Sequence, residues 1–250
     1  MSILRASGLV MPLNSSAFDP QRQPTISQSP LRVLSPGCFQ LDFIRHAFAH
    51  PFAWSVEPVC EASFCTTAFQ EKSLKPAAVF MPLVQRPSGV HVLFTRRAAH
   101  LLHHAGQISF PGGRIEPTDA NIAQAALRET QEEVGIDPVF VDLIGTHPGF
   151  ITSSRYAMTP VIGALKPGFS VQPNHNEVAE VFEVPLSVLM DPAVHRLHRS
   201  AQPDGQVRLY FSMTWHSYFI WGATAALLRN FYRYLATAET VFSGSSSSLP

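Results

Sequence analysis

The alternation of strand-like and helix-like segments along this sequence predicts an α/β or α+β sandwich. Short apolar runs, such as residues 76–84 (PAAVFMPLV), have the composition of buried strands. Amphipathic stretches with apolar residues about four positions apart, such as residues 119–134, have the period of helices. Because the two kinds of segment are mixed and no internal repeat is visible, we expect helices to pack against a sheet within one domain.

Composition divides the chain into three parts. Residues 1–38 are rich in Pro, Ser and Gln without hydrophobic periodicity, so we expect a mostly irregular N-terminal extension. Residues 39–240 hold the apolar and amphipathic segments and are expected to form a single domain. Residues 241–250 include a run of serines that can bury almost nothing, which predicts a flexible tail.

In the first half of the domain the sequence predicts a short helix, a strand pair and a long helix. These elements cover residues 41–48, 76–84 with 90–95, and 119–134, whereas residues 50–75 fit no single element. The sequence Pro87-Ser-Gly provides a turn between the two strands. In the long helix, apolar or small residues recur every four positions from Ile122 to Val134, and Gly135 is a stop signal.

The second half of the domain is predicted to alternate again between strands and helices. The expected elements are strands at 139–145, 158–165 and 178–184, a short helix at 186–190, a hairpin of 207–211 with 215–220, and a final helix at 223–236. Residues 150–156 are interpreted as a connecting loop, although Arg155 and Tyr156 could instead line a substrate cleft.

The charge balance excludes one broad class of function. Lys and Arg together number 18, as do Asp and Glu, so the net charge is zero. A general nucleic-acid binder would show a basic excess, and we therefore expect no nucleic-acid partner. Any anionic substrate must be met by local cations, a metal ion or backbone N–H groups.

The cysteines and the apolar runs indicate a soluble cytoplasmic protein. Cys38, Cys60 and Cys65 form no CxxC pair, so neither a disulfide framework nor a structural zinc site is indicated. The N-terminal residues lack the features of a signal peptide. No run approaches the roughly 18 apolar residues of a membrane helix, so no membrane association is expected.

Three glutamates of the long helix form the densest acidic cluster of the chain. Glu129 precedes Glu132 by three positions and Glu133 by four, so their carboxylates project to one side. Like charges at this spacing repel by roughly 0.2–0.5 kcal/mol per pair, which a divalent cation with oxygen ligands would offset. The alternative is a solvated acidic face with Arg128 as a local counter-ion.

The residues before this helix favour the metal site over the solvated face. Residues 110–119 (FPGGRIEPTD) lead from the end of a strand through a double-glycine loop into the helix. Gly112 and Gly113 allow a sharp turn and a close approach to a ligand. Thr118 or Asp119 could cap the helix.

This strand–loop–helix segment resembles the Nudix box, G-x5-E-x7-R-E-U-x-E-E-x-G-U, in which U is a bulky aliphatic residue. The second half of the box is matched by Arg128, Glu129, Thr130 at U, Glu132, Glu133, Gly135 and Ile136. Upstream, Asp119 stands where a glutamate is expected, and residues 120–127 make the following spacer one residue longer than the pattern. Whether Asp119 or Glu116 meets Arg128 stays open at this point.

A second segment resembles the additional motif of the coenzyme A diphosphatase branch of the Nudix family. The motif is matched by residues 93–113 (LFTRRAAHLLHHAGQISFPGG), with further matches at 176–178, 181–186 and 218–225, so that the resemblance covers about residues 76–236. It implies coenzyme A as the small-molecule substrate, with Arg96 and Arg97 suited to bind phosphate oxygens. Members of the branch often carry a basic residue where Leu102 stands, which leaves open how the 3′-phosphate is held.

The resemblance implies a Nudix-type α/β/α sandwich with a mixed β-sheet, and roles for the box residues. Glu129 and Glu133 would bind Mg²⁺ or Mn²⁺ directly, and Glu132 would bind a second ion or a metal-bound water. Backbone N–H groups near Gly112 and Gly113 would add donors for the substrate.

The implied reaction is attack of water on a phosphorus, releasing 4′-phosphopantetheine and adenosine 3′,5′-bisphosphate. Glu177 is the leading candidate outside the box for the base that takes the proton of the water. A carboxylate of the box is the alternative base, and Glu177 would then be a surface residue that opens a strand. The predicted catalytic set is Glu132, Glu133, Glu177 and Arg128.

Several alternatives remain open at the level of sequence. The substrate could be ADP-ribose, NADH or a dinucleotide, or the chain could be a binding protein that has the fold without the activity. His100, His103 and His104 could be read as a metal cluster, although hydrogen bonding within their loop fits the motif better. A homodimer is also left open.

Overall fold

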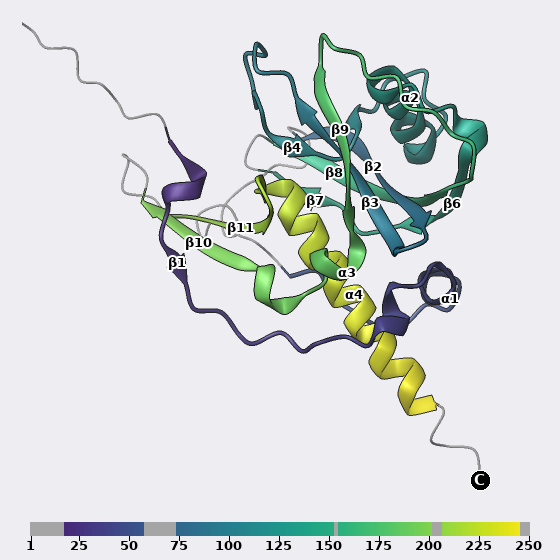
Figure 1. Cartoon of the computed structure of the whole chain (residues 1–250), viewed down its shortest axis with the longest axis vertical. Coiled ribbons are helices and arrows are strands. Elements are labelled where there is room, and N and C mark those ends of the chain that lie inside the picture. The colour runs from purple at the N-terminus through teal and green to yellow at the C-terminus, as the bar shows by residue number, and fades with distance from the viewer. Residues whose placement is uncertain (1–17, 58–73, 153–154, 202–206, 246–250) are drawn as a thin grey trace, which may run out of the picture.

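The computed structural model describes residues 18–57, 74–152, 155–201 and 207–245. Within these ranges the chain forms two sheets and four α-helices, which confirms the predicted α+β class (Figure 1). The larger sheet has eight strands in the order β4-β3-β2-β8-β6, with β5 paired to β2, β7 to β8 and β9 to β3. The smaller sheet has the order β1-β10-β11-β12.

The strands of the larger sheet are β2 (Lys75–Arg86), β3 (Gly89–Arg97), β4 (Ile108–Ser109), β5 (Gly112–Arg114), β6 (Val141–Thr146), β7 (Phe150–Ile151), β8 (Tyr156–Leu165) and β9 (Val178–Pro185). Those of the smaller sheet are β1 (Thr25–Ile26), β10 (Arg196–Ala201), β11 (Val207–Trp215) and β12 (Tyr218–Trp221). The helices are α1 (Leu41–Ala49), α2 (Ile122–Val134), α3 (Leu186–Leu189) and α4 (Ala223–Ser245).

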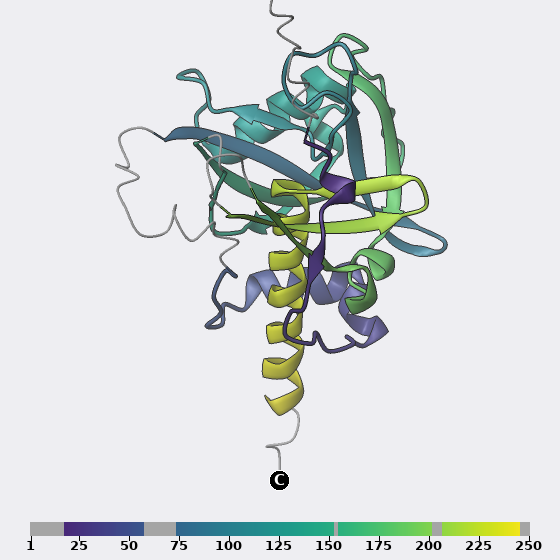
Figure 2. The same cartoon turned by 90° about the vertical axis from the view of Figure 1, so that its left-hand side faces the viewer.

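The central strand β2 divides the hydrophobic core into two parts. It runs antiparallel to β3 and β5 and parallel to β8, so the larger sheet is mixed as expected. Its side chains alternate between the two faces of the sheet. Val79, Met81 and Leu83 belong to the core that contains α1 and α4, whereas Ala78 and Phe80 belong to the core under α2. Figures 1 and 2 show α2 and α4 on opposite sides of this sheet.

The ends of two helices differ from the predicted ones. We expected Thr118 or Asp119 to cap the long helix, but α2 is capped by Asn121, whose side chain accepts a hydrogen bond from the Gln124 N–H. The final helix extends to Ser245, so residues 241–245 are helical, although they fall within the tail we expected to be flexible. Phe242 supports this extension because it packs edge-on against Phe43 of α1.

The strands that the sequence did not predict lack a clear apolar alternation. In β10 the buried positions are His198 and Ser200, which are polar and give no hydrophobic signal. Strands β1, β4, β5 and β7 have two or three residues each, and β7 lies in the stretch we interpreted as a loop. Their pairing partners, rather than their own sequences, make them strands.

The N-terminal part of the chain is attached to the domain at several points. Within the described residues 18–38 the backbone is mostly irregular, yet it buries Leu34 and Cys38 and adds β1 to the smaller sheet. The Glu57 carboxylate accepts hydrogen bonds from Arg229 at 2.8 Å and Arg233 at 3.1 Å. No helix in the described ranges is long and apolar enough to cross a membrane.

His147 is buried within an aromatic cluster beside the last strand of the larger sheet. Its ring stacks on Phe48 and contacts Trp54 and Tyr234, and its Nε2 has no hydrogen-bond partner among the described residues. Burial lowers the pKa of His147 to about 3. The ring is therefore neutral in the folded protein at every pH near neutrality.

We expect His147 to make the fold sensitive to acid. The unfolded chain binds a proton on this ring below about pH 6.5, whereas the folded protein does so only near pH 3. The stability present above pH 6.5 should thus be lost as the pH falls, by about 2 kcal/mol at pH 5. Urea unfolding of the wild type and His147→Phe at pH 7 and pH 5 measures this difference.

The matched control is His175→Phe, at a position where the ring is exposed. His147→Phe should show a smaller loss of unfolding free energy between pH 7 and pH 5 than the wild type and this control. Equal losses in all three proteins would contradict the assignment.

Candidate active site

The double-glycine segment lies against the central strand at a distance that only glycine permits. Strand β5 pairs with the start of β2, so that Gly112 faces Val79. Gly112 has φ +154°, and a Cβ at this position would lie 2.4 Å from the Ala78 carbonyl oxygen. Any side chain there would push β5 off the sheet.

At Gly113 the space for a side chain is restricted from the other side, by α2. A Cβ on Gly113 would lie 2.4 Å from both Cδ and Oε1 of Glu129. The carboxylate of Glu129 therefore rests directly on the backbone of the turn. The two glycines allow strand, turn and helix to meet, as the sequence predicted from their freedom to approach closely.

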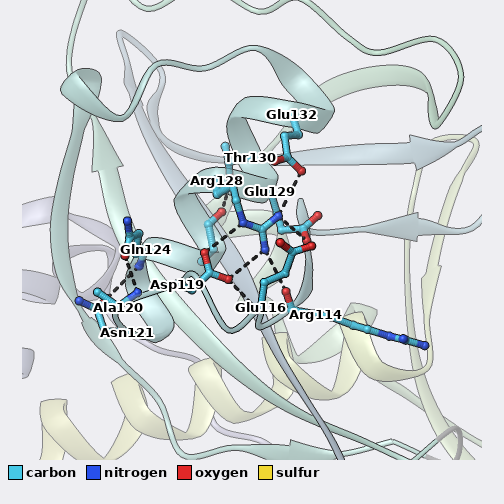
Figure 3. Close-up of polar contacts among 11 residues, drawn as sticks. Arg114, Glu116, Asp119, Ala120, Asn121, Gln124, Arg128, Glu129, Thr130 and Glu132 are labelled. Carbon is cyan, nitrogen blue, oxygen red and sulfur yellow. Dashed lines mark hydrogen bonds and ion pairs between the residues drawn. The ribbon is translucent and has the colours of Figure 1, made fainter.

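Arg128 joins the turn, the following loop and the helix (Figure 3). Its guanidinium donates to both carboxylate oxygens of Asp119, at 3.0 Å each, and to the Arg114 carbonyl oxygen at 3.0 Å. It also donates to Glu129 at 3.0 Å and to Glu132 at 3.2 Å. The partner that the sequence left open is thus Asp119.

The Arg128–Asp119 pair shifts the titration of both groups. The Arg128 guanidinium holds the pKa of Asp119 below its usual range, and Asp119 raises the pKa of Arg128. Asp119 also accepts a hydrogen bond from the Glu116 N–H at 2.8 Å, which closes the loop between them. The longer spacer is accommodated because residues 120 and 121 lie before the first turn of α2.

Glu133 is the most deeply buried glutamate of the box, with 4% of its surface exposed. Its Oε2 accepts a hydrogen bond from the Gly112 N–H at 3.4 Å, and its Oε1 lies 3.9 Å from an Nη of Arg97. Burial raises the pKa of Glu133 to about 8, opposed by Arg97 and reinforced by the charges of Glu129 and Glu177. This carboxylate is thus short of positive charge.

Glu177 belongs to the same group of charges, although it lies on a different segment. It is the residue before β9, and its carbonyl oxygen accepts a hydrogen bond from the Ala98 N–H at 2.7 Å. Its carboxylate raises the pKa of both Glu129 and Glu133. The structure therefore brings Glu129, Glu133 and Glu177 together with Arg97.

Glu132 and Arg96 are directed elsewhere. The Glu132 side chain is 57% exposed and turns toward Arg128 rather than toward Glu133. Arg96 lies 3.4 Å from Glu180 and stacks over the ring of Tyr218, whose hydroxyl donates to Glu180 at 2.6 Å. No pattern in the sequence indicates this contact, because Glu180 and Tyr218 are on separate strands that meet only in the fold.

The donors at the site fit a divalent cation, although they do not converge on one point. In the described part of the chain, no three His, Cys, Asp or Glu side chains are arranged to hold an ion. The carboxylates of Glu129 and Glu133 nevertheless supply the oxygen ligands that Mg²⁺ and Mn²⁺ prefer, and burial raises the pKa of both. A cation beside them would relieve this cost.

Two of the three histidines of the preceding loop form hydrogen bonds. His100 Nε2 lies 3.0 Å from the Asn176 carbonyl oxygen, and His104 Nδ1 lies 2.7 Å from Oε1 of Gln107. The first contact connects the loop to the segment before Glu177, and the second lies within the loop. They agree with hydrogen bonding rather than with a histidine metal cluster.

The mixed sheet between helices, the double-glycine turn and the helix with Glu129 and the buried Glu133 define a hydrolase of the Nudix class. Residues 74–204 match the family described as NUDIX domain, and the chain belongs to this family. Nudix hydrolases act on pyrophosphate bonds of small nucleotide derivatives and generally use divalent metal ions.

The curated relatives are proteins called "Uncharacterized Nudix hydrolase NudL". The protein of this name from Cronobacter sakazakii is 41% identical over 158 residues, which cover 62% of this chain and 80% of the relative. That from Shigella boydii is 40% identical over 156 residues with the same coverage. A solved Nudix hydrolase from M. smegmatis, RenU, is 24% identical with a TM-score of 0.39, covering 45% of this chain and 71% of that chain.

We expect Gly113→Ala to impair catalysis without unfolding the protein. The added Cβ would displace the Glu129 carboxylate, and a shift of about 1 Å in a catalytic group can lower a rate on the order of 100-fold. Initial rates of metal-dependent diphosphate hydrolysis, together with thermal unfolding, measure the effect. The control is Gly37→Ala, where a Cβ would meet only the Ser35 Oγ at 4.0 Å. Wild-type rates for Gly113→Ala would show that this contact has no role.

Proposed function

We propose that this Nudix hydrolase cleaves the diphosphate of coenzyme A or its thioesters, releasing 4′-phosphopantetheine and adenosine 3′,5′-bisphosphate. The observation that supports this most is the attachment of the motif loop, residues 98–107, to the acidic group. The N–H of Ala98 donates to the backbone carbonyl oxygen of Glu177 at 2.7 Å, and the N–H of Arg97 donates to the carbonyl oxygen of Gln107 at 3.0 Å. The segment whose sequence resembles the coenzyme A motif thus includes Arg97, which lies 3.9 Å from the Glu133 carboxylate.

Glu129 and Glu133 are the proposed ligands of Mg²⁺ or Mn²⁺, with Glu132 as a ligand of a second ion. A divalent ion supplies positive charge to the diphosphate oxygens and lowers the pKa of the attacking water. Burial of Glu133 serves this purpose, because an ion held by a carboxylate with few other partners is bound more strongly.

The other residues of the site bind, orient or accept a proton. Arg97 is the proposed phosphate-binding arginine, since its guanidinium lies beside Glu133 and its Nε is buried without a hydrogen-bond partner among the described residues. The N–H groups of Gly112 and Gly113 add donors. Arg128 orients Glu129 and is a positioning residue, and Glu177 is the proposed base.

Arg96 stays in the proposal only as a residue at the edge of the substrate site, because Glu180 already neutralises it. We further propose that residues 39–240 act as a single domain in the cytoplasm. ADP-ribose, NADH and dinucleotides are the alternative substrates. A binding protein without activity is the alternative from another class.

Comparison of coenzyme A, ADP-ribose and NADH at equal Mg²⁺ tests the substrate. We expect the highest kcat/KM for coenzyme A, and mass spectrometry should identify the two named products. Preference for ADP-ribose or NADH by tenfold or more would replace coenzyme A by that substrate. Absence of metal-dependent products from all three would favour a binding protein.

We expect Glu133→Gln and Glu177→Gln to lower kcat in different ways. Loss of a metal-binding carboxylate should lower kcat by on the order of 10³-fold, which is about 4 kcal/mol of barrier. Loss of the base should lower kcat by about 100-fold. Glu183→Gln, which removes a carboxylate paired with Arg86, is the control. A kcat of Glu177→Gln equal to that of this control would transfer the role of base to the box.

A further inference from the structure

Tyr156, whose ring lies next to two cationic side chains, is close to the double-glycine turn. The Tyr156 hydroxyl accepts hydrogen bonds from two guanidinium nitrogens of Arg114, Nε at 3.3 Å and Nη2 at 3.2 Å. The Lys75 ammonium lies 5.6 Å from the centroid of the same ring, and the Arg114 guanidinium lies 5.7 Å from it. The three residues come from adjacent strands, β2, β5 and β8.

This cluster has more positive charge than its surroundings neutralise. The exposed arginines Arg45 and Arg86 each pair with a carboxylate, as do Arg96 and Arg128. In the described ranges, by contrast, no Asp or Glu oxygen lies within ion-pair distance of Lys75 or Arg114, and both side chains are exposed. A neutral phenol is a weak partner for a guanidinium with five N–H donors. Such an unbalanced pair of cations attracts an anion.

The position of Arg114 relates this charge to the acidic group. Arg114 follows Gly113, whose backbone touches the Glu129 carboxylate. Its carbonyl oxygen is held by Arg128, while its side chain extends away from the glutamates in Figure 3. An anion on the guanidinium would therefore lie beside the turn, at a position separate from a diphosphate held at Glu129 and Glu133. A nucleotide that carries both a diphosphate and a ribose phosphate has two such separate anionic groups.

We propose that Lys75 and Arg114 bind the phosphate monoester on the ribose of the substrate, with Tyr156 positioning the guanidinium. This inference rests on the proposed function and concerns the specificity of that site. A guanidinium can offer two parallel N–H groups to a phosphate, and the ammonium adds a point charge. The ring holds both cations in place before the substrate arrives, which reduces the entropy lost on binding.

Coenzyme A and 3′-dephospho-coenzyme A, which differ by this phosphate alone, provide the test. The wild type should have a kcat/KM for coenzyme A higher by about tenfold or more, the size expected for one charge-assisted hydrogen bond. Arg114→Gln should remove this preference by raising KM for coenzyme A about tenfold more than KM for the dephospho form. Tyr156→Phe should lower the preference by about threefold. Lys166→Gln, at the end of β8 remote from Tyr156, should keep it.

Other outcomes overturn the inference. An equal loss on both substrates in Arg114→Gln would mean that the arginine contacts the diphosphate, and an unchanged preference would mean that it contacts no phosphate. If the wild type hydrolyses neither compound, the proposed function fails. Calorimetric titration of adenosine 3′,5′-bisphosphate then tests whether the cluster of Lys75, Arg114 and Tyr156 binds a phosphate. Binding no tighter than that of adenosine 5′-phosphate, or unaffected by Arg114→Gln, would then exclude the phosphate site.

Discussion

The bidentate pairing of Arg128 with Asp119 fixes the relation between the turn and the helix. The same guanidinium reaches the Arg114 carbonyl oxygen and Glu129, so one side chain sets the position of the strand, the loop and a proposed metal ligand. Without it, three carboxylates on one helix would repel each other and turn outward. The close contact of Gly113 with Glu129 exists because this pairing holds α2 against β5. The geometry of the proposed site thus depends on an interaction between two residues that are not themselves proposed ligands.

The apolar residues that stabilise the larger sheet and the ionisable residues of the proposed site lie in different parts of it. Its apolar side chains fill two cores, whereas the ionisable groups gather where β3 ends, β5 begins and β9 starts. Glu133 is buried at this edge with only a long hydrogen bond and a distant arginine. Burial with so few partners disfavours the charged form of this carboxylate and raises its pKa to about 8. Binding of a cation would stabilise the charged carboxylate and so offset the cost of its burial.

The sequence predicted the regular elements well because their apolar pattern is strong. The paired strands about Pro87, the helix ending at Gly135 and the strand through Val161 are confirmed. It failed where polar residues are buried, as in β10, and where Asn121 rather than Asp119 caps α2, because Arg128 had already engaged Asp119. Contacts of Arg96 and Arg114 were also beyond prediction. Their partners come from strands distant in the chain, and spacing along one helix carries no information about them.

The parallel pairing of β2 with β8 has a consequence for the synthesis of the protein. Lys75 lies opposite Tyr156, which follows it by 81 positions (156 − 75). Glu57 binds Arg229, which follows it at a still larger separation in the chain. Contacts between such distant residues form slowly, because a long loop must close first. As the chain leaves the ribosome, β2 can pair with β3 and β5, which both precede β8, while its other edge stays open to neighbouring chains. Chaperones that cover this edge would therefore improve the yield of active enzyme.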